Sequence, residues 1–419
     1  MSAPSGARAS GPWHQDVTAE QWRAFFAAYL GWMLDGFDFT ILTFLLVEIQ
    51  RTFTVNSALA GALGTATLLL RVVGGIGAGT AADRWGRKGP LMFSILWYSI
   101  FAFLGGFSTS YGALFACRAL FGIGMGGVWA AGMPLALEHW PARLRGTASG
   151  LLQGGYAMGF ILSSLVYQYG YPLVARHVDE AWRVMLWIGL LPALVVLWIA
   201  VNVKESPVWL SRQQPTGAAA LPFSVTRLFT PGLRGVTFHT SLLMAAFLFL
   251  YQAITFWYPT LLGQLGRAPL SFLVSFNAGA VAGNIICGQL SETRLGRRGA
   301  VSLATVTGIA AVPLFIFATS TPALLVGAAI VGAFGTGNFG AIPGYLSERF
   351  PTDVRAGGAG FAYHVGAALA AVAPYLVGSL VDDGVELARA MAWCIVMSGA
   401  AVILIMWLGP ETRGRTFDS

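Results

Sequence analysis

Twelve long apolar stretches divide this chain of 419 residues, and they leave little room for any fold except a bundle of membrane helices. Each has about 18 residues or more, enough to cross the hydrocarbon core of a bilayer as an α-helix. Their approximate limits are 22–47, 58–82, 89–108, 111–138, 145–169, 182–203, 236–263, 270–291, 300–319, 322–347, 356–381 and 388–408. Only 10% of the residues are charged, against about 25% in soluble domains. The sequence therefore predicts an all-α membrane protein with twelve transmembrane helices.

The positions of lysine and arginine predict the orientation of these helices. With the N-terminus in the cytoplasm, 18 of the 25 basic residues fall on the cytoplasmic side and five on the other side. Cytoplasmic loops carry such an excess in membrane proteins. We therefore expect a multi-pass protein of a bacterial-type inner membrane, with both termini cytoplasmic. The basic residues form short clusters between apolar stretches, so a nucleic-acid partner is not expected.

The chain repeats itself in two halves. GTAADRWGRKG (79–89) corresponds to GQLSETRLGRRG (288–299), LEHWPARLRG (137–146) to SERFPTDVRA (347–356), and KESP (204–207) to PETRGR (410–415). The three matches keep the same order about 206–210 residues apart, which indicates two parallel six-helix units. We predict an N-terminal segment 1–21, a six-helix bundle 22–203, a linker 204–235, a second bundle 236–408 and a tail 409–419.

These motifs resemble those of the major facilitator superfamily over nearly the whole chain. GTAADRWGRKG is similar to its signature after helix 2, and RALFGIGMGG (118–127) to its signature in helix 4. LDGFDF, LLRVVGG and LEHWPARLRG look most like the sialate:proton and carboxylate:proton symporters, with the aromatic-acid:proton symporters as near neighbours. The helix 7 signatures of sugar porters and fungal lactate permeases are missing from FLFLYQAITFWYPT (247–260). The resemblance implies two pseudo-symmetric six-helix bundles and secondary active transport.

Four charged side chains lie inside the apolar stretches: Asp35, Asp38, Arg71 and Arg118. Each costs roughly 2.5–3.5 kcal/mol at the centre of an inserted helix, so such groups normally pair or face a watery cavity. At about 1.5 Å per residue, Asp35 lies closer in depth to Arg71, and Asp38 to Arg118.

The guanidinium fork binds carboxylates bidentately and stays charged, which suits Arg71 as the anchor of a substrate anion. An acid beside it can take up a proton as the arginine engages or releases that anion. We expect Asp35 and Asp38 to carry protons, with Arg118 as their coupling partner. The alternative is a static cluster of ion pairs that fastens three helices together.

The second half offers polar rather than charged side chains within its stretches. Gln252, Trp257, Tyr258, Asn277 and Asn284 are the candidate substrate contacts, because they can bond a polyol or hydroxy-acid body. His364 is a further candidate for proton coupling, since histidine titrates near neutral pH. The alternative is that these groups only bond helices to one another.

The repeated junctions predict gates at the cytoplasmic side. Asp83 and Arg87 are expected to pair with Glu138 and with the start of helix 11, and the second half should mirror this. The full set of gating candidates is Asp83, Arg87, Glu138, Arg145, Glu292, Arg297, Glu348 and Arg355. The alternative is that the basic members only anchor the topology.

The sequence carries no convincing nucleophile and base, metal cluster or phosphate loop. The glycines of GIGMGG follow no strand, so they are not read as a nucleotide-binding turn. We therefore expect no enzyme, no metal and no cofactor. The predicted function is proton-coupled symport of an organic anion, a monocarboxylate or sialate-like acid, into the cell by a functional monomer. The alternatives are an aromatic-acid or sugar importer and a membrane sensor that does not transport.

Overall fold

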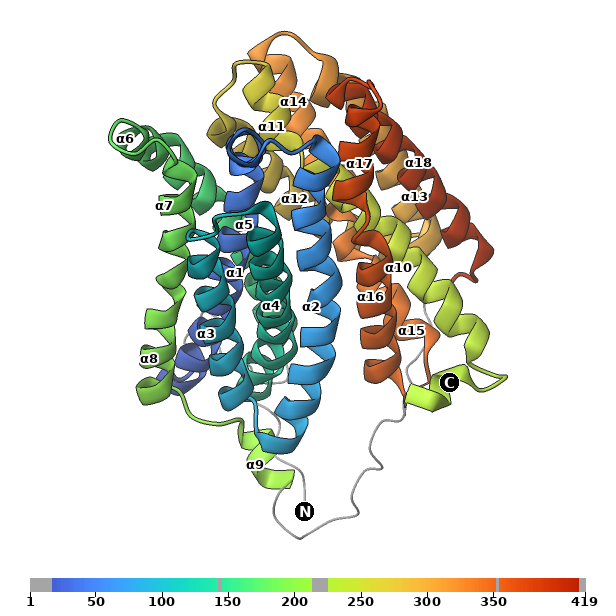
Figure 1. Ribbon diagram of the computed structural model, residues 1–419. Coiled ribbons are helices and arrows are strands. Elements are labelled where there is room, and N and C mark those ends of the chain that lie inside the picture. The colour runs from blue at the N-terminus through green and yellow to red at the C-terminus, as the bar shows by residue number, and fades with distance from the viewer. Residues whose placement is uncertain (1–16, 142–144, 213–224, 352–353, 414–419) are drawn as a thin grey trace, which may run out of the picture.

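Helices form nearly all of the chain in the computed structural model, which describes residues 17–141, 145–212, 225–351 and 354–413 (Figure 1). No strand occurs within these ranges. The first half comprises α1 (Ala19–Phe53), α2 (Ser57–Trp85), α3 (Lys88–Gly105), α4 (Tyr111–His139), α5 (Arg145–Leu165), α6 (Tyr171–Ala175), α7 (Ala181–Trp187) and α8 (Pro192–Asn202). After α9 (Pro207–Arg212), the second half comprises α10 (Arg234–Thr255), α11 (Tyr258–Gln264), α12 (Pro269–Glu292), α13 (Gly296–Ala310), α14 (Thr321–Ile330), α15 (Ile342–Arg349), α16 (Arg355–Ala370), α17 (Ala373–Asp382) and α18 (Leu387–Leu408). The predicted all-α architecture is confirmed.

Several membrane-crossing segments are interrupted by tighter or wider turns. A π-helical turn at Val166–Gly170 joins α5 to α6, a second at Pro313–Phe317 follows α13, and a third at Val331–Gly335 follows α14. Short 3-10 turns at Ile188–Leu190 and Gly337–Gly340 join α7 to α8 and lead towards α15. Such irregular turns, proline and glycine are the usual causes of helix kinks, and neighbouring helices satisfy the backbone groups they free.

Among the described residues, eleven segments are long and apolar enough to cross a membrane. α5 is not one of these eleven, and it provides the twelfth span. α5 is rich in glycine and serine and packs against α1 and against α12 of the second half. A Cβ added at Gly159 would overlap the main-chain oxygen of Met33 on α1. Small residues permit such close crossings, and they also lower the hydropathy of the helix. The predicted twelve-helix fold is confirmed.

Equivalent close helix crossings occur in the two halves. In the first, α2 packs along α4, and a Cβ added at Gly126 would overlap the main-chain oxygen of Arg71. In the second, α12 packs along the segment from α14 to α15, and a Cβ added at Gly283 would overlap the main-chain oxygen of Ala333. Only glycine lets two backbones approach this closely. The crossings therefore fix α2 and α12 at corresponding places in the two bundles.

The halves meet where α2 contacts α16 and α17, α5 contacts α12, and α1 contacts α11. We call the face at which α1 begins and α18 ends the terminal face, and the other the opposite face. On the opposite face, Asp382 accepts hydrogen bonds from the main-chain nitrogens of Ser57 (2.8 Å) and Ala58 (2.6 Å). Thr260 donates to the main-chain oxygen of Thr43 at 3.5 Å. These contacts close the opposite face, where α2 lies beside α17 in Figure 1.

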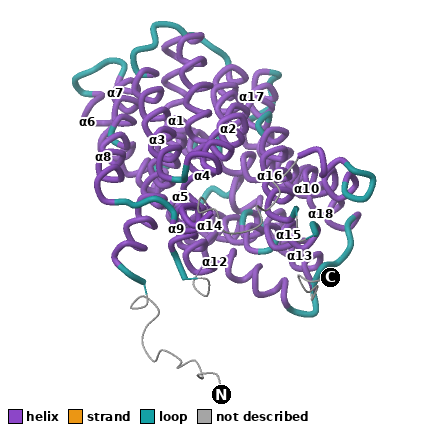
Figure 2. Tube along the Cα trace, turned by 90° about the horizontal axis from the view of Figure 1, so that it is seen from below, coloured by secondary structure: helices purple, strands orange, loops and turns teal. Residues whose placement is uncertain are grey.

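The remaining helices lie away from the junction of the halves. Seen from below, α3 and α8 flank the first half on its outer side, and α13 and α18 flank the second half (Figure 2). These four helices expose large apolar side chains, among them Phe93, Leu197, Leu303 and Leu404. In a membrane protein such surfaces contact lipid, so the polar interior must be sought between α1, α2, α4, α5, α10 and α16.

Candidate functional site

The embedded carboxylates lie in the protein interior without a closed ion pair. Asp35, Asp38 and Arg118 are at most 1% exposed. Both side-chain oxygens of Asp35 and Oδ2 of Asp38 are buried and have no hydrogen-bond partner. Nη1 of Arg118 donates to the main-chain oxygen of Asp38 at 3.2 Å rather than to its carboxylate. The positive charge of Arg71 acts on Asp35, and that of Arg118 acts on Asp38. The structure therefore groups the charges as their depths predict, but it leaves the carboxylates open to another partner.

Arg71 lies on α2 over an aromatic ring of α1. Its Cζ is 5.2 Å from the centre of the Trp32 ring, and its Nη2 is buried without a hydrogen-bond partner. Nε1 of Trp32 is likewise buried and unpartnered. The Trp32 ring contacts the ring of Tyr156 on α5 at 5.2 Å between centres. The predicted anion anchor is thus a guanidinium with an unused donor, held over an indole by a cation–π contact.

A small hollow between the halves adjoins this group. It is lined by Phe39, Thr40, Thr43, Tyr156, Phe160, Tyr251, Thr255 and Phe256, which come from α1, α5, α10 and the turn after α10. Tyr156 contacts the Trp32 ring at 5.2 Å, and the guanidinium of Arg71 lies 5.2 Å from the centre of that ring, so the hollow lies next to the charged groups. Its lining combines aromatic rings with hydroxyl groups, as small-molecule sites commonly do.

An aromatic stack crosses between the halves on the terminal side of Arg71. Trp129 on α4 lies parallel to Tyr363 on α16, with 5.4 Å between ring centres. The His364 ring stands edge-on to both, at 6.0 Å from Trp129 and 5.6 Å from Tyr363. His364 also lies against Gly75 of α2, one helical turn beyond Arg71, whose charge acts on it. The stack therefore covers the site from the terminal face.

The five predicted substrate contacts of the second half differ in whether their polar atoms already have hydrogen-bond partners. Oε1 of Gln252 and Oδ1 of Asn284 are buried without hydrogen-bond partners, whereas Nδ2 of Asn277 donates to the main-chain oxygen of Leu273 at 2.9 Å. Nε1 of Trp257 donates to the main-chain oxygen of Pro374 at 2.9 Å. Tyr258 stacks on Phe315 with 4.2 Å between centres, inside the second half. A substrate contact for these five side chains stays a prediction.

The aromatic members of the site were missed by the sequence reasoning. Trp32, Trp129, Tyr156, Tyr251 and Tyr363 converge from five helices of both halves. Aromatic residues make up 13% of the chain, so no position stands out in a one-dimensional pattern. Their only usable signal is nearness to an embedded charge: Trp32 precedes Asp35 by one helical turn.

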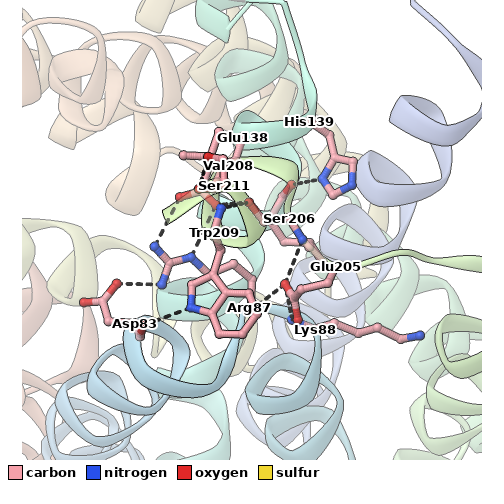
Figure 3. Close-up of polar contacts among 11 residues, drawn as sticks. Asp83, Arg87, Lys88, Glu138, His139, Glu205, Ser206, Val208, Trp209 and Ser211 are labelled. Carbon is pink, nitrogen blue, oxygen red and sulfur yellow. Dashed lines mark hydrogen bonds and ion pairs between the residues drawn. The ribbon is translucent and has the colours of Figure 1, made fainter. Parts of the chain in front are cut away.

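The junction after α2 forms a dense polar cluster at the terminal face (Figure 3). Arg87 contacts Asp83 through Nη1 at 2.6 Å and Glu138 through Nη2 at 3.2 Å. Ser206 donates to Glu138, and Glu205 accepts from the main-chain nitrogen of Arg87 at 2.7 Å. Burial lowers the pKa of Arg87, but the hydrogen bonds to Glu138 and Asp83 outweigh burial and raise the pKa above its ordinary value. The cluster therefore binds α2, α3, α4 and the segment before α9 into one unit.

The second half repeats this cluster with equivalent residues. Arg297 contacts Glu348 at 2.7 Å and Glu292 at 2.6 Å through Nη2. Thr412 donates to Glu348 at 2.6 Å, and Glu411 accepts from the main-chain nitrogen of Arg297 at 2.9 Å. Glu411 and Thr412 occupy the places of the acid and hydroxyl that follow α8. The KESP and PETRGR repeats thus supply these two residues, a role the sequence reasoning did not give them.

Two parts of the predicted gates are not seen in contact. The side chains of Arg145 and Arg355 lie outside the described residues. Within the described part of the chain, no hydrogen bond or ion pair joins Asp83 or Arg87 to α16. Each cluster lies inside one half, and gating by these residues stays a prediction.

Comparison with known proteins identifies the family. The model of the Major Facilitator Superfamily matches residues 28–374. The chain is 36% identical to a probable 4-methylmuconolactone transporter of Cupriavidus pinatubonensis, covering 97% of this chain and 94% of the relative. It is 30% identical to the sialic acid transporter NanX of Escherichia coli, covering 97% and 98%. The inward open structure of the xylose transporter XylE from E. coli matches with a TM-score of 0.74 at 19% identity, covering 95% of this chain and 98% of that one. The chain therefore belongs to the major facilitator superfamily, and it is a multi-span membrane transporter rather than an enzyme.

Proposed function

We propose that this transporter carries an organic acid together with protons, as a symporter working into the cell. The observation that carries the proposal is Asp35, a fully buried carboxylate with both oxygens unpartnered, on which the charge of Arg71 acts while Nη2 of Arg71 is itself unpartnered. A buried charge without a partner is costly, so this pair favours binding of a proton, an anion or both. The names of the muconolactone and sialic acid transporters among the relatives support an organic acid.

Charge balance links the substrate to the proton. Asp35, Asp38, Arg71 and Arg118 sum to zero, so the interior is neutral when all four are ionised. A substrate carboxylate that binds the fork of Arg71 adds one negative charge and takes the arginine away from Asp35. Protonation of Asp35 restores neutrality in a region where net charge is expensive. We expect one proton to accompany each carboxylate on the substrate.

The polar clusters would then govern access to the site. Arg87 with Glu138, and Arg297 with Glu348, hold the terminal end of each half as a rigid unit. If the terminal face is cytoplasmic, as the basic residues predict, opening there would release the substrate inward. Function as a monomer is part of the same proposal.

Uptake into proteoliposomes tests this proposal. Labelled carboxylates and sialic acid are offered with and without an inward proton gradient, and the gradient should drive accumulation of at least one of them. Asp35→Asn keeps the shape but cannot titrate, so it should abolish gradient-driven accumulation while exchange of labelled for unlabelled substrate persists. Arg71→Lys keeps the charge but loses the fork and should weaken binding. Asp383→Asn, at an exposed acid of the opposite face, is the control. Uptake that ignores the gradient for every acid refutes proton coupling.

A further inference from the structure

We infer that Trp32 is a second recognition group of the site and selects an unsaturated, planar acid that carries another oxygen acceptor. The inference rests on the proposed function, because it assigns the substrate class of the same site. Trp32 belongs to α1, one turn before Asp35, and its indole lies between Arg71 of α2 and Tyr156 of α5. A single side chain thus contacts both the predicted anion anchor and the lining of the hollow.

Two buried donors without acceptors meet at this point. Nε1 of Trp32 and Nη2 of Arg71 each lack a hydrogen-bond partner, although the guanidinium lies only 5.2 Å from the indole centre. Buried polar atoms are nearly always satisfied in folded proteins, so an unmatched pair of donors is a place where a bound acceptor is strongly favoured. An indole N–H can only donate, as can a guanidinium. A substrate that satisfies both donors therefore presents an oxygen acceptor to each of them.

The N–H groups of Arg71 and Trp32 point in different directions, so one small carboxylate is not expected to accept hydrogen bonds from both. The guanidinium lies over the face of the ring, whereas an indole N–H points outwards in the plane of the ring. A substrate that satisfies both needs one carboxylate for Arg71 and a second oxygen group at the edge of Trp32. A second carboxylate or a lactone carbonyl would meet this requirement.

The rings around these donors select the body of the substrate. Trp32 and Tyr156 contact each other at 5.2 Å with 43° between their planes, and Tyr156 and Tyr251 line the hollow from both halves. Flat π-systems pack on such rings in offset or edge-to-face geometry, and this adds a preference beyond the burial of area. A saturated chain of the same length gains the burial but not this preference.

Muconate and adipate separate the two contributions, because both are six-carbon diacids and only muconate is conjugated. Binding of each to the purified protein is measured for the wild type, Trp32→Phe and Trp32→Leu, with thermal unfolding as a check on folding. Trp32→Leu should lower the preference for muconate over adipate about three- to tenfold. Trp32→Phe keeps the ring but loses the N–H, so it should weaken both diacids by a similar factor and largely keep the preference. Trp97→Leu is the matched control, since Nε1 of Trp97 bonds to Leu120 on α4 away from the site.

The outcomes separate this inference from the function on which it rests. If the wild type binds acids but prefers adipate, or if Trp32→Leu keeps the muconate preference, the inference is overturned and acid transport stands. If the wild type binds neither diacid but accumulates sialic acid, the planar substrate class is wrong and acid transport again stands. If no acid binds or is accumulated, both the inference and the proposed function fail.

Discussion

Asp382 provides a direct test of what closes the opposite face. Its two carboxylate oxygens accept hydrogen bonds from the main-chain nitrogens of Ser57 (2.8 Å) and Ala58 (2.6 Å). These nitrogens are among the first N–H groups of α2, which have no partner inside the helix. The helix's own cap, Asn56, bonds to the nitrogen of Leu59 at 3.0 Å instead. An acid of the second half therefore completes the cap of a helix in the first half.

The size of the effect follows from the chemistry of helix caps. Loss of a side-chain cap costs about 0.5–2 kcal/mol, and a negative charge near a helix N-terminus adds about 0.3–1 kcal/mol at low ionic strength. Asp382 is exposed, so screening by solvent reduces its contribution to about 1 kcal/mol. That corresponds to about a fivefold change in an equilibrium constant. Asp382→Asn removes the charge and one acceptor, and we expect it to favour opening of the opposite face about fivefold.

Distances between spin labels on the two halves measure this shift. Cysteines replace Thr109 and Ser320, which are exposed in the turns before α4 and α14, in a background carrying Cys117→Ala. The long-distance population should grow in Asp382→Asn. Asn56→Ala is the control, because it weakens the start of α2 in every state and should lower the melting temperature without changing the distances. Coinciding distributions for Asp382→Asn and the wild type would refute the reasoning, as would an equal shift in the control.

Three further predictions concern stability. Burial raises the pKa of Glu411, but hydrogen bonds from main-chain N–H groups outweigh burial and hold the pKa below its ordinary value. The ionised carboxylate therefore stabilises the fold above the unfolded-state pKa, and this stabilisation is lost as the pH falls through the folded-state pKa. Glu411→Gln should therefore lower the melting temperature near neutral pH and flatten its fall in acid. Gly126→Ala should destabilise the protein by about 1–3 kcal/mol in a denaturation assay, because the added Cβ meets the backbone of α2. Gly79→Ala should be neutral or slightly stabilising in the same assay, because the nearest atom to its added Cβ is Cβ of Ala130 at 3.8 Å. Arg87→Lys keeps the charge but cannot bridge both of its acids with one fork, so thermal unfolding should begin several degrees earlier than in Arg84→Lys.

The fold was largely predictable because membrane spans and internal repeats are patterns along the sequence itself and need no knowledge of contacts between helices. Apolar stretches located every span, including α5, whose glycines lowered its hydropathy without hiding its length. The breaks inside spans were not predicted. Pro313 stands at the start of a π-helical turn, and the turns at 331–335 and 337–340 each contain two glycines. The length of an apolar stretch does not reveal such a local change of hydrogen-bond pattern.

The site was predictable only where a residue is anomalous in its own helix. Asp35 and Arg71 are conspicuous as charges in hydrocarbon, and helical rise was enough to match their depths. Trp32 and Tyr363 are ordinary residues for a membrane helix and become notable only through neighbours on other helices. The contact of Asp382 is not predictable for a related reason, since its partners are main-chain nitrogens that any sequence would supply.

The two ends of α2 explain how motion of the halves can reach the site. α2 is a continuous α-helix of 29 residues, about 43 Å long, that reaches from one face to the other. Its first turn is bound to the second half through Asp382, whereas its last turn is bound to its own half through Asp83, Arg87 and Glu138. Separation of the halves on the opposite face must break the first attachment but can keep the second. Arg71 lies between these ends and faces α1, so α2 would carry the proposed anion anchor with its own half, while Tyr363 and His364 belong to the other half. The same movement that opens the opposite face would therefore change which half surrounds the substrate.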